Sequence, residues 1–285
     1  EVVLAVYSVA VFATLAGART IDVPWSEGPY PTQRVLEQVT ALTSMIALVS
    51  PNNPTGAVAT AEDLRRLSAG APGALVLVDA AYAEFADEDL TATALKLPNT
   101  LVVRTFSKAL GLAGLRVGYC VGPAELIRAM RAAGGPFPVS ALSLLAAERA
   151  LEDAPRTLAR VVPRVRRERD ELSAVLRTLG ATPAPSQGNF VLARFSDSDW
   201  AWRALASQGV AVRRFAAEST LADALRITLP GDDARFARLR SALHAALRPE
   251  ALLLDMDGVI ADVSGSYRAA IRATSTVCCS SPPTR

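Results

Sequence analysis

The sequence predicts an α/β fold built on a mostly parallel sheet and followed by a smaller α+β domain. Two observations support this prediction. In the first half of the chain, short and almost continuously apolar runs alternate with helix-length segments, which is typical of a parallel sheet buried on both faces. From about Pro138 the pattern changes to two long helical segments and then to short strands. With 285 residues, 51% of them hydrophobic, the chain is long enough for about two domains with packed cores.

The first half contains five runs typical of buried strands. These are residues 2–6 (VVLAV), 45–50 (MIALVS), 74–79 (ALVLVD), 100–107 (TLVVRTFS) and 116–122 (RVGYCVG). The helical segment 60–70 starts with Thr60 and Asp63 at the spacing of a capping box. The apolar start of the chain is predicted to be a strand, a turn and a helix. It lacks the basic segment of a signal peptide and is shorter than the ~20 residues of a membrane span.

The second half is predicted to hold helices at 140–153 and 155–179, strands in NFVLARF, GVAVRRF and LRITL, and a closing helix at 232–247. The pattern restarts after Pro249 with ALLLDMDGV, and the last residues have no periodicity. We therefore expect domains at 1–137, 138–248 and 249–272, followed by a disordered tail at 273–285.

Charge and cysteine content exclude several classes of function. The 30 basic and 28 acidic residues nearly cancel, and the densest basic run also contains acids, so we expect neither a nucleic-acid nor a membrane partner. Three cysteines without metal-ligand spacing favour a reducing compartment, either the cytoplasm or an organelle if a transit peptide lies upstream. His244 is the only histidine, and we expect it to be a half-buried packing residue of the last helix, so we expect neither a zinc cluster nor a Ser-His triad.

Three of the predicted strands end in polar residues. Asn53 follows the second strand, Asp79 ends the third and is followed by Tyr82, and Lys108 follows the fourth. Ligands of open α/β sheets bind beyond the carboxyl ends of the strands, so these side chains are expected on one rim. Each also has an ordinary explanation, as a turn, a helix cap or a surface pair. The nearby glycines do not fit a dinucleotide or Walker loop, which argues against nucleotide binding.

The segments SPNNPTG, VDAAYAEF and VVRTFSKALGLAGLRVGY closely resemble the fold-type-I aminotransferases, which depend on pyridoxal 5'-phosphate (PLP), and among them the histidinol-phosphate aminotransferases. The resemblance covers residues 1 to about 248. It implies a PLP-binding large domain and a small domain, transamination of an amino donor such as histidinol phosphate with 2-oxoglutarate, and a homodimer with a shared active site.

The resemblance also implies roles for residues around the PLP ring. Lys108 would attach the cofactor through its amine and then move the proton of the substrate Cα. Asp79 would face the pyridine nitrogen and favour its protonated form. Asn53 and Tyr82 would hydrogen-bond the phenolic oxygen of the ring. Tyr7 corresponds to the aromatic residue that stacks on the ring.

Further residues would bind anionic groups. Arg116, with Thr105 and Ser107, would hold the cofactor phosphate, a task that suits a planar guanidinium. Arg226 would bind the substrate α-carboxylate, with Asn189 beside it. The chain has DAAY where the family usually has Asp-Glu-Ala-Tyr, and Ala5 where it usually has proline. We expect the family's N-terminal arm and one phosphate-binding loop to lie upstream of Glu1, together with the tyrosine that the partner subunit receives.

Two other functions remain open. Phosphothreonine decarboxylases share these motifs, and release of CO₂ instead of amino-group transfer would identify one. A truncated, inactive remnant is the second alternative, although every motif from Asn53 to Arg116 is intact.

The segment LLLDMDGVIADVSGSYRAAI (252–271) resembles the start of haloacid-dehalogenase-type phosphatases. This resemblance implies that Asp255 is a nucleophile, that Asp257 is a general acid/base, and that both bind Mg²⁺. The alternative is a helix-capping turn. We expect no phosphatase activity from this short segment.

Overall fold

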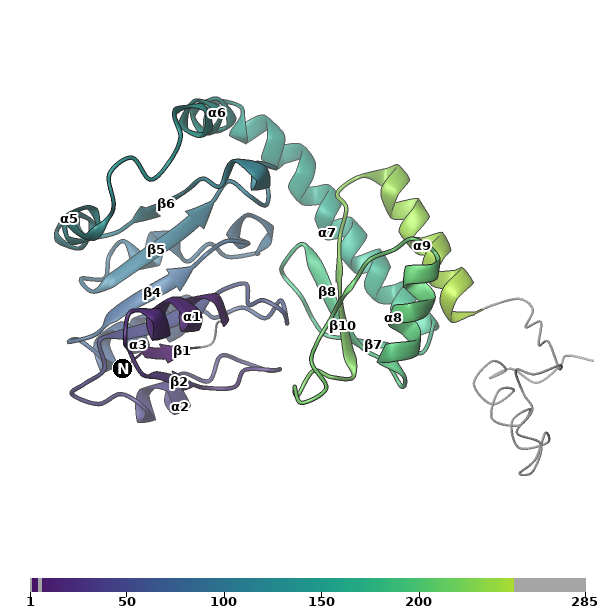
Figure 1. Ribbon diagram of the computed structural model, residues 1–285, viewed down its shortest axis with the longest axis horizontal. Helices are drawn as coiled ribbons and strands as arrows, with labels where there is room; N and C mark the ends of the chain where they lie inside the picture. The colour runs from purple at the N-terminus through teal and green to yellow at the C-terminus, as the bar shows by residue number, and fades with distance from the viewer. Residues whose placement is uncertain (1, 5–6, 249–285) are drawn as a thin grey trace, which may run out of the picture.

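The computed structural model describes residues 2–4 and 7–248, with side chains from residue 9 onward. Two units, each built on one sheet, lie side by side in it (Figure 1). The elements of the first unit are β1 (Val2–Leu4), α1 (Tyr7–Leu15), β2 (Thr20–Asp22), α2 (Thr32–Glu37), β3 (Met45–Val49), α3 (Ala61–Gly70), β4 (Leu75–Asp79), the 3₁₀ turn η1 (Ala83–Phe85), α4 (Thr91–Ala94), β5 (Thr100–Thr105), the 3₁₀ turn η2 (Ala113–Leu115), β6 (Gly118–Val121) and α5 (Ala124–Ala133).

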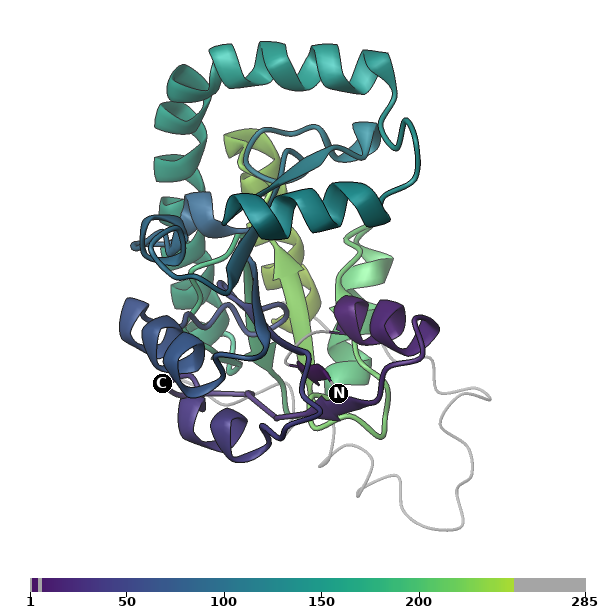
Figure 2. The ribbon, with the colours of Figure 1, turned by 90° about the vertical axis from the view of Figure 1, so that its left-hand side faces the viewer.

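The remaining elements form the second unit and its connection to the first. They are α6 (Ala141–Glu152), α7 (Ala154–Thr178), β7 (Thr182–Pro183), β8 (Phe190–Arg194), α8 (Ser198–Ser207), β9 (Arg213–Arg214), β10 (Ala224–Thr228) and α9 (Asp233–Leu247). A single residue, Asp153, separates α6 from α7. Figure 2 shows α6 lying across the end of the first unit and α7 running down beside it.

The first sheet confirms the predicted parallel architecture. Its strand order is β2-β1-β3-β4-β5-β6. All neighbours are parallel except β5 and β6, which pair antiparallel between Val102 and Val121 and between Thr105 and Gly118. Because β3, β4 and β5 run in the same direction, they all end at one edge, which we call the carboxyl edge. The predicted strand at 116–122 is shorter than expected, because Arg116 adopts left-handed backbone angles (φ 51°) before β6 begins.

Apolar strand residues and helix α3 form the core of the first unit. Ile46 and Leu48 of β3 pack with Val76 and Val78 of β4. Leu64 and Leu67 of α3 cover them and are fully buried. The predicted capping box starts this helix, because Thr60 Oγ1 accepts from Asp63 N and Asp63 Oδ2 accepts from Thr60 N. The helix α3 therefore begins where the local sequence predicts, and its apolar side packs on the sheet.

The second unit is an antiparallel sheet of order β7-β8-β10-β9, covered by helices. Leu172 and Leu176 of α7 pack on Phe190 of β8 and Leu225 of β10. The predicted strand GVAVRRF is wrong over most of its length, since only Arg213 and Arg214 pair with β10. Val210 and Val212 instead pack against the core of this unit.

Helix α6 packs on the first unit, where Ala147 contacts Phe106 and Val117. The expected domain boundary at 137/138 stays a prediction. His244 is exposed and not half-buried as expected, because α9 turns its neighbour Leu243 into the core instead. None of the helices in the described part of the chain could cross a membrane by length and apolarity. The cytoplasmic location stays a prediction, and the expected segments 249–272 and 273–285 lie outside the described residues.

Candidate functional site at the carboxyl edge of the first sheet

The carboxyl edge brings together residues that are far apart in the sequence. Asn53 follows β3, Asp79 is the last residue of β4, and Thr105 is the last residue of β5. Asp79 and Val103 are neighbours in register, and Ala80 N donates to Val103 O at 2.9 Å. The loop that carries Lys108 therefore leaves the sheet directly beside Asp79, as the sequence predicts.

Asp79 is a mostly buried carboxylate. Burial raises the pKa of Asp79, while a hydrogen bond from Ala81 N (3.0 Å) and the positive charge of Lys108 act in the opposite direction. The charged form of such a group is stabilised by a cation placed against it. Asp79 is thus suited to face a positively charged ring nitrogen.

Tyr82 and Lys108 lie close together at this edge. Lys108 Nζ is 5.3 Å from the centroid of the Tyr82 ring, a cation–π distance. The Tyr82 ring is buried and packs edge-to-face on Phe190 of the second unit, with centroids 5.1 Å apart. Lys108 itself is exposed, so its amine is accessible from solvent. The two units therefore meet at the tyrosine that flanks the candidate nucleophile.

Arg226 of the second unit reaches Asn53 of the first. Its Nη1 donates to Asn53 Oδ1 at 2.5 Å, and its guanidinium carbon lies 5.2 Å from the Phe190 ring centroid. Arg226 Nε is buried and has no hydrogen-bond partner among the described residues. A buried donor without a partner costs free energy unless a ligand accepts its hydrogen bond. An anionic group bound at Arg226 would satisfy it.

The charge around Arg226 also favours an anion. Burial lowers the pKa of Arg226, and the positive charge of Arg213 lowers it further, against the opposing effect of Tyr82. Arg213 lies opposite Arg226 in the register of β9 and β10. Sequence reasoning did not single out Arg213, because only the pairing of the two strands places it beside Arg226. A bound acid group would offset the repulsion between the two neighbouring guanidiniums of Arg213 and Arg226.

The predicted phosphate-binding residues are only partly brought together. Thr105 Oγ1 accepts from Ser107 N at 3.1 Å, which fixes the turn before Lys108. Arg116 is exposed, and its Nη1 donates to Ala113 O at 3.0 Å within its own loop. Gly118, which pairs with Thr105, holds β6 close, since a Cβ there would lie 2.6 Å from Arg104 O. The backbone positions agree with the prediction, whereas the Arg116 side chain points to its own loop.

The other predicted residues have simpler positions. Tyr7 begins α1, immediately after the strand that pairs with β3, and its side chain lies outside the described part. Asn189 precedes β8 and is half-buried, and its carbonyl accepts from Leu229 N at 2.9 Å. Asp255 and Asp257 lie outside the described residues.

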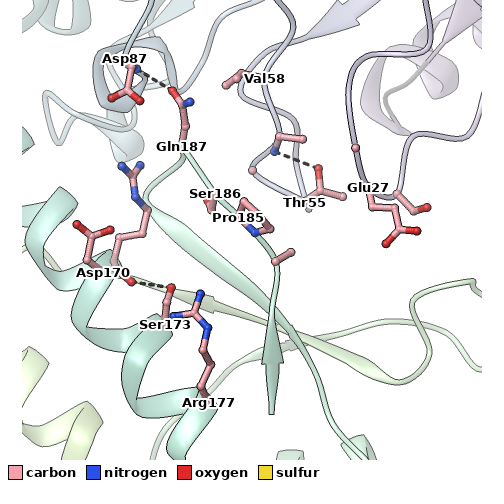
Figure 3. A pocket seen from close by; sticks show the side chains of 16 residues that line it. Glu27, Thr55, Val58, Asp87, Asp170, Ser173, Arg177, Pro185, Ser186 and Gln187 are labelled. Carbon is pink, nitrogen blue, oxygen red and sulfur yellow. Dashed lines mark hydrogen bonds between the residues drawn. The ribbon is translucent and has the colours of Figure 1, made fainter.

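A cleft of about 650 Å³ opens between the two units (Figure 3). Gln187 lies on one side and Asp87 on the other. Gln187 Oε1 accepts from Asp87 N at 2.7 Å, and Gln187 N donates to Gly56 O at 2.8 Å. Lys108 and Asp79 are not among the residues that line the cleft. We therefore place the chemistry at the carboxyl edge and regard Gln187 as a contact that holds the units together, which the sequence did not reveal.

Comparison with known proteins agrees with this geometry. The family described as aminotransferase class I and II matches residues 8–243. A histidinol-phosphate aminotransferase of Paracoccus denitrificans is 38% identical over 232 residues, which are 80% of this chain and 62% of that protein. An aromatic amino acid aminotransferase of a Mycobacterium species is 36% identical over 75% of this chain and 60% of its own. The chain thus spans about three fifths of the length of these two relatives.

Solved structures show the same architecture. The histidinol-phosphate aminotransferase of Sinorhizobium meliloti, in complex with pyridoxal-5'-phosphate, superposes with a TM-score of 0.73 at 28% identity, over 86% of this chain and 69% of that one. An L-threonine-O-3-phosphate decarboxylase of Porphyromonas gingivalis reaches 0.70 at 22% identity, over 86% of this chain and 75% of that one, and shows the fold alone. The family match, the sheet order and the residues of the carboxyl edge lead to one conclusion. This chain belongs to the family of class I and II aminotransferases.

Proposed function

We propose that the protein catalyses PLP-dependent transamination, with histidinol phosphate as amino donor and 2-oxoglutarate as acceptor. The observation that carries the proposal is the position of Lys108. Its amine lies 5.3 Å from the Tyr82 ring and interacts electrostatically with the half-buried carboxylate of Asp79. The 38% identity to a histidinol-phosphate aminotransferase supports the choice of donor.

The residues at the carboxyl edge fit PLP in chemical type. Asp79 is a carboxylate that burial disfavours in its charged form, and a protonated pyridine nitrogen would provide its counter-charge. Asn53 uses its Oδ1 for Arg226, and its amide nitrogen can donate to the phenolic oxygen of PLP. The hydroxyls of Thr105 and Ser107 suit a phosphate, with Arg116 as the expected cation. When bound, PLP supplies an electron sink for the electron pair left at the substrate Cα.

The side chains of this chain would then perform the remaining steps. Lys108 Nζ takes the proton from the substrate Cα and later returns one, so it serves as base and acid in turn. The Tyr82 hydroxyl and the Asn53 amide orient the ring. Arg226 binds the acid group of the substrate through its unpaired Nε, which fixes Cα near Lys108.

Arg213 supports a substrate that carries a phosphate. Histidinol phosphate has a phosphate ester and no carboxylate, whereas 2-oxoglutarate has carboxylates alone. One site must therefore accept both kinds of anion. Arg226 with Arg213 opposite it offers two positive charges, which suit a doubly charged phosphate and also a carboxylate.

Labelling tests the proposal sharply, because the sequence has two lysines, Lys96 and Lys108, and both are exposed. The protein is incubated with PLP, reduced with borohydride and digested. We expect the pyridoxyl group on Lys108 and none on Lys96. Transamination of histidinol phosphate should fall by several orders of magnitude in Lys108→Ala, because the base is lost. A label on Lys96 alone would contradict the proposal.

The same assay distinguishes the alternatives. A decarboxylase of the phosphothreonine type would release CO₂ without consuming 2-oxoglutarate. An inactive remnant would show no turnover with either substrate, although it could still bind PLP at Lys108. Equal rates with histidinol phosphate and an aromatic amino acid would leave the family intact and contradict the choice of donor.

The resemblance also supports a homodimer with a shared site. Apolar side chains are exposed along α6, where Leu142 is 77% and Leu145 is 64% exposed. Such a surface marks a protein contact more often than a solvent face. We expect a dimer in sedimentation of the purified protein and a shift towards monomer in the variant Leu142→Glu/Leu145→Glu. A monomeric wild-type chain would contradict the proposal for these residues.

For residues 249–272 we propose the opening segment of a haloacid-dehalogenase-type domain, with Asp255 as nucleophile and Asp257 as acid/base. Phosphoryl transfer also needs cationic stabilisation and a fully coordinated Mg²⁺, which we do not expect so short a segment to provide. We therefore expect no turnover of a phosphomonoester with Mg²⁺. Turnover that disappears in Asp255→Asn would overturn this expectation.

A further inference from the structure

A largely buried ion cluster connects the loop after β4 to strand β5. Arg104 Nη2 donates to Glu84 Oε1 at 2.8 Å, and its Nη1 donates to Asp89 Oδ2 at 2.6 Å and to Thr91 Oγ1 at 2.9 Å. The side chains of Arg104 and Glu84 are only 10% and 11% exposed, whereas that of Asp89 is 45% exposed. The pair Arg104–Glu84 is therefore the desolvated part of the cluster.

The position of this pair in the sequence is informative. Glu84 lies in η1, two residues after Tyr82, and Arg104 lies in β5, four residues before Lys108. The pair thus joins the loop after β4 to the strand that leads to Lys108. Asp89 lies farther along, in the connection to α4, an element that contains none of the site residues.

The backbone on both sides of the pair is fixed. Phe85 N donates to Tyr82 O at 3.0 Å, which ties Glu84 and Tyr82 into one short turn. On the other strand, a Cβ on Gly118 would lie 2.6 Å from Arg104 O, so β6 holds the Arg104 backbone closely. Loss of the ion pair would therefore displace the turn that contains Tyr82 more readily than the backbone of Arg104 in the sheet.

The ion pair leaves two of its polar atoms without hydrogen bonds. Within the part of the chain that the structure describes, Arg104 Nε and Glu84 Oε2 are buried without hydrogen-bond partners. A buried ion pair with unsatisfied atoms contributes little net stability, and hydrophobic residues of the same size would serve packing equally well. A role in fixing geometry accounts for its presence better than a role in stability.

We propose that Glu84 and Arg104 are positioning residues, whose ion pair holds Tyr82 in place against Lys108. The proposal rests on the proposed function of Lys108 and Tyr82. Neither residue is among those expected to contact the substrate or the cofactor, and the pair acts through the turn that contains Tyr82.

A matched pair of variants tests it. Glu84→Gln and Asp89→Asn each remove one carboxylate charge from Arg104 and keep the size of the side chain. We expect Glu84→Gln to lower kcat by about tenfold to a hundredfold with KM little changed, because a displacement near 1 Å at a reacting group has effects of this order. Asp89→Asn should stay within about twofold of wild type on the same reasoning.

A second readout does not need the loaded enzyme. In the cofactor-free protein, the amines of Lys108 and Lys96 are labelled competitively with acetic anhydride at one fixed pH, and Lys96 serves as internal reference. We expect the ratio of Lys108 label to Lys96 label to change in Glu84→Gln, because the Tyr82 ring beside Lys108 moves, and to be unchanged in Asp89→Asn. Glu84→Asp keeps the charge one methylene shorter and should restore part of the ratio, and it replaces Glu84→Gln if that variant does not fold.

Equal behaviour of Glu84→Gln and Asp89→Asn in both readouts would overturn the inference. Failure of the proposed function is a separate outcome, since it appears in the wild-type protein as a missing pyridoxyl label on Lys108. The labelling of the cofactor-free variants still tests the ion pair in that case.

Discussion

Gly56 and Ser186 are in contact across the two units with no space for a side chain between them. A Cβ atom on Gly56 would lie 2.0 Å from Ser186 Oγ and 2.7 Å from Ser186 Cα. Gly56 also has a φ of +79°, a conformation that disfavours other residues. The first unit therefore presents bare backbone to the loop that leads to Asn189 and β8.

This contact predicts a cost for Gly56→Ala. Gly17 is a matched control, because its φ is +80° but nothing lies within 4 Å of its Cβ position. Gly17→Ala should lose about 1 kcal/mol from backbone strain alone. Gly56→Ala should lose about 1–3 kcal/mol more, from the clash with Ser186. Urea denaturation measures the loss in free energy of unfolding of each variant, provided that the m-value stays constant. Equal losses in the two variants would show that the contact between residue 56 and Ser186 adapts to the added methyl group without cost.

Arg226→Lys is expected to weaken substrate binding. A lysine keeps the positive charge but cannot offer two parallel donors to an acid group, so KM should rise about tenfold or more while kcat changes less. Asn53→Ala removes the group that holds Arg226 Nη1 and should produce a smaller rise in KM. Steady-state kinetics with histidinol phosphate provide the measurement. A loss in kcat alone for Arg226→Lys would assign Arg226 to the chemical step instead.

The raised pKa of Asp79 predicts that ionisation of Asp79 destabilises the cofactor-free protein as the pH rises. The native state binds this proton more tightly than the unfolded state does. The contribution of Asp79 to stability is therefore full at pH values below the ordinary carboxylate pKa and is lost as pH rises through the raised pKa. Asp79→Asn cannot ionise, so it should raise the melting temperature of the cofactor-free protein at pH 7 by a few degrees and less at pH 4. Transamination should fall in the same variant.

The contribution of Asp89 to stability should depend on pH in the opposite direction to that of Asp79. Burial acts to raise the pKa of Asp89, but hydrogen bonds from Thr91 and Arg104 outweigh it, and the net pKa is lowered. Its contribution is present above the ordinary carboxylate pKa and is lost as pH falls through the lowered pKa. Asp89→Asn should therefore lower the melting temperature at pH 7, and this loss should shrink towards pH 3. A higher melting temperature of Asp89→Asn at pH 7 would contradict the hydrogen bonds from Thr91 and Arg104 to Asp89.

The capping box of α3 predicts a loss of stability at two positions. Thr60→Ala removes one cap and should cost about 1 kcal/mol. Asp63→Ala should cost more, because Asp63 accepts from Thr60 N, from Thr60 Oγ1 and from Thr32 Oγ1. Glu62→Ala is the control, since the ion pair that Glu62 forms with Arg65 is exposed and its loss should change stability little. Chemical denaturation ranks the three variants, and equal losses in all would contradict the capping role.

Sequence reasoning reached the first sheet and the carboxyl edge for a physical reason. Strands such as Met45–Val49 and Leu75–Asp79 are short apolar runs followed at once by polar residues, and both properties are local. The order of strands along a parallel sheet then places Asp79 and Lys108 near one another without further information. The cap at Thr60 was predictable for the same reason.

The contacts that the sequence did not reveal are all non-local. Arg213 lies beside Arg226 only through the pairing of β9 with β10, and Gln187 meets Asp87 only because the units touch. The strand around Val210 was overestimated because its apolar residues serve the core of the second unit instead of a sheet. Arg116 donates a hydrogen bond to a backbone carbonyl of its own loop, and the spacing of residues in the sequence does not predict this direction of its side chain.

Helix α7 has a mechanical consequence for the site. It is 25 residues long, about 37 Å at the usual rise per residue. Near its middle, Arg166 is bound to the carbonyls of Phe85 and Ala86, while Leu172 and Leu176 carry the second sheet farther along. A turn of about 5° around Arg166 would move Leu176, about 15 Å away, by about 1 Å. If strand β10 moved with Leu176, a displacement of that size would lengthen the 2.5 Å hydrogen bond between Arg226 and Asn53 beyond bonding distance. We therefore expect the tilt of α7, a helix that contributes none of the predicted site residues, to affect the position of Arg226.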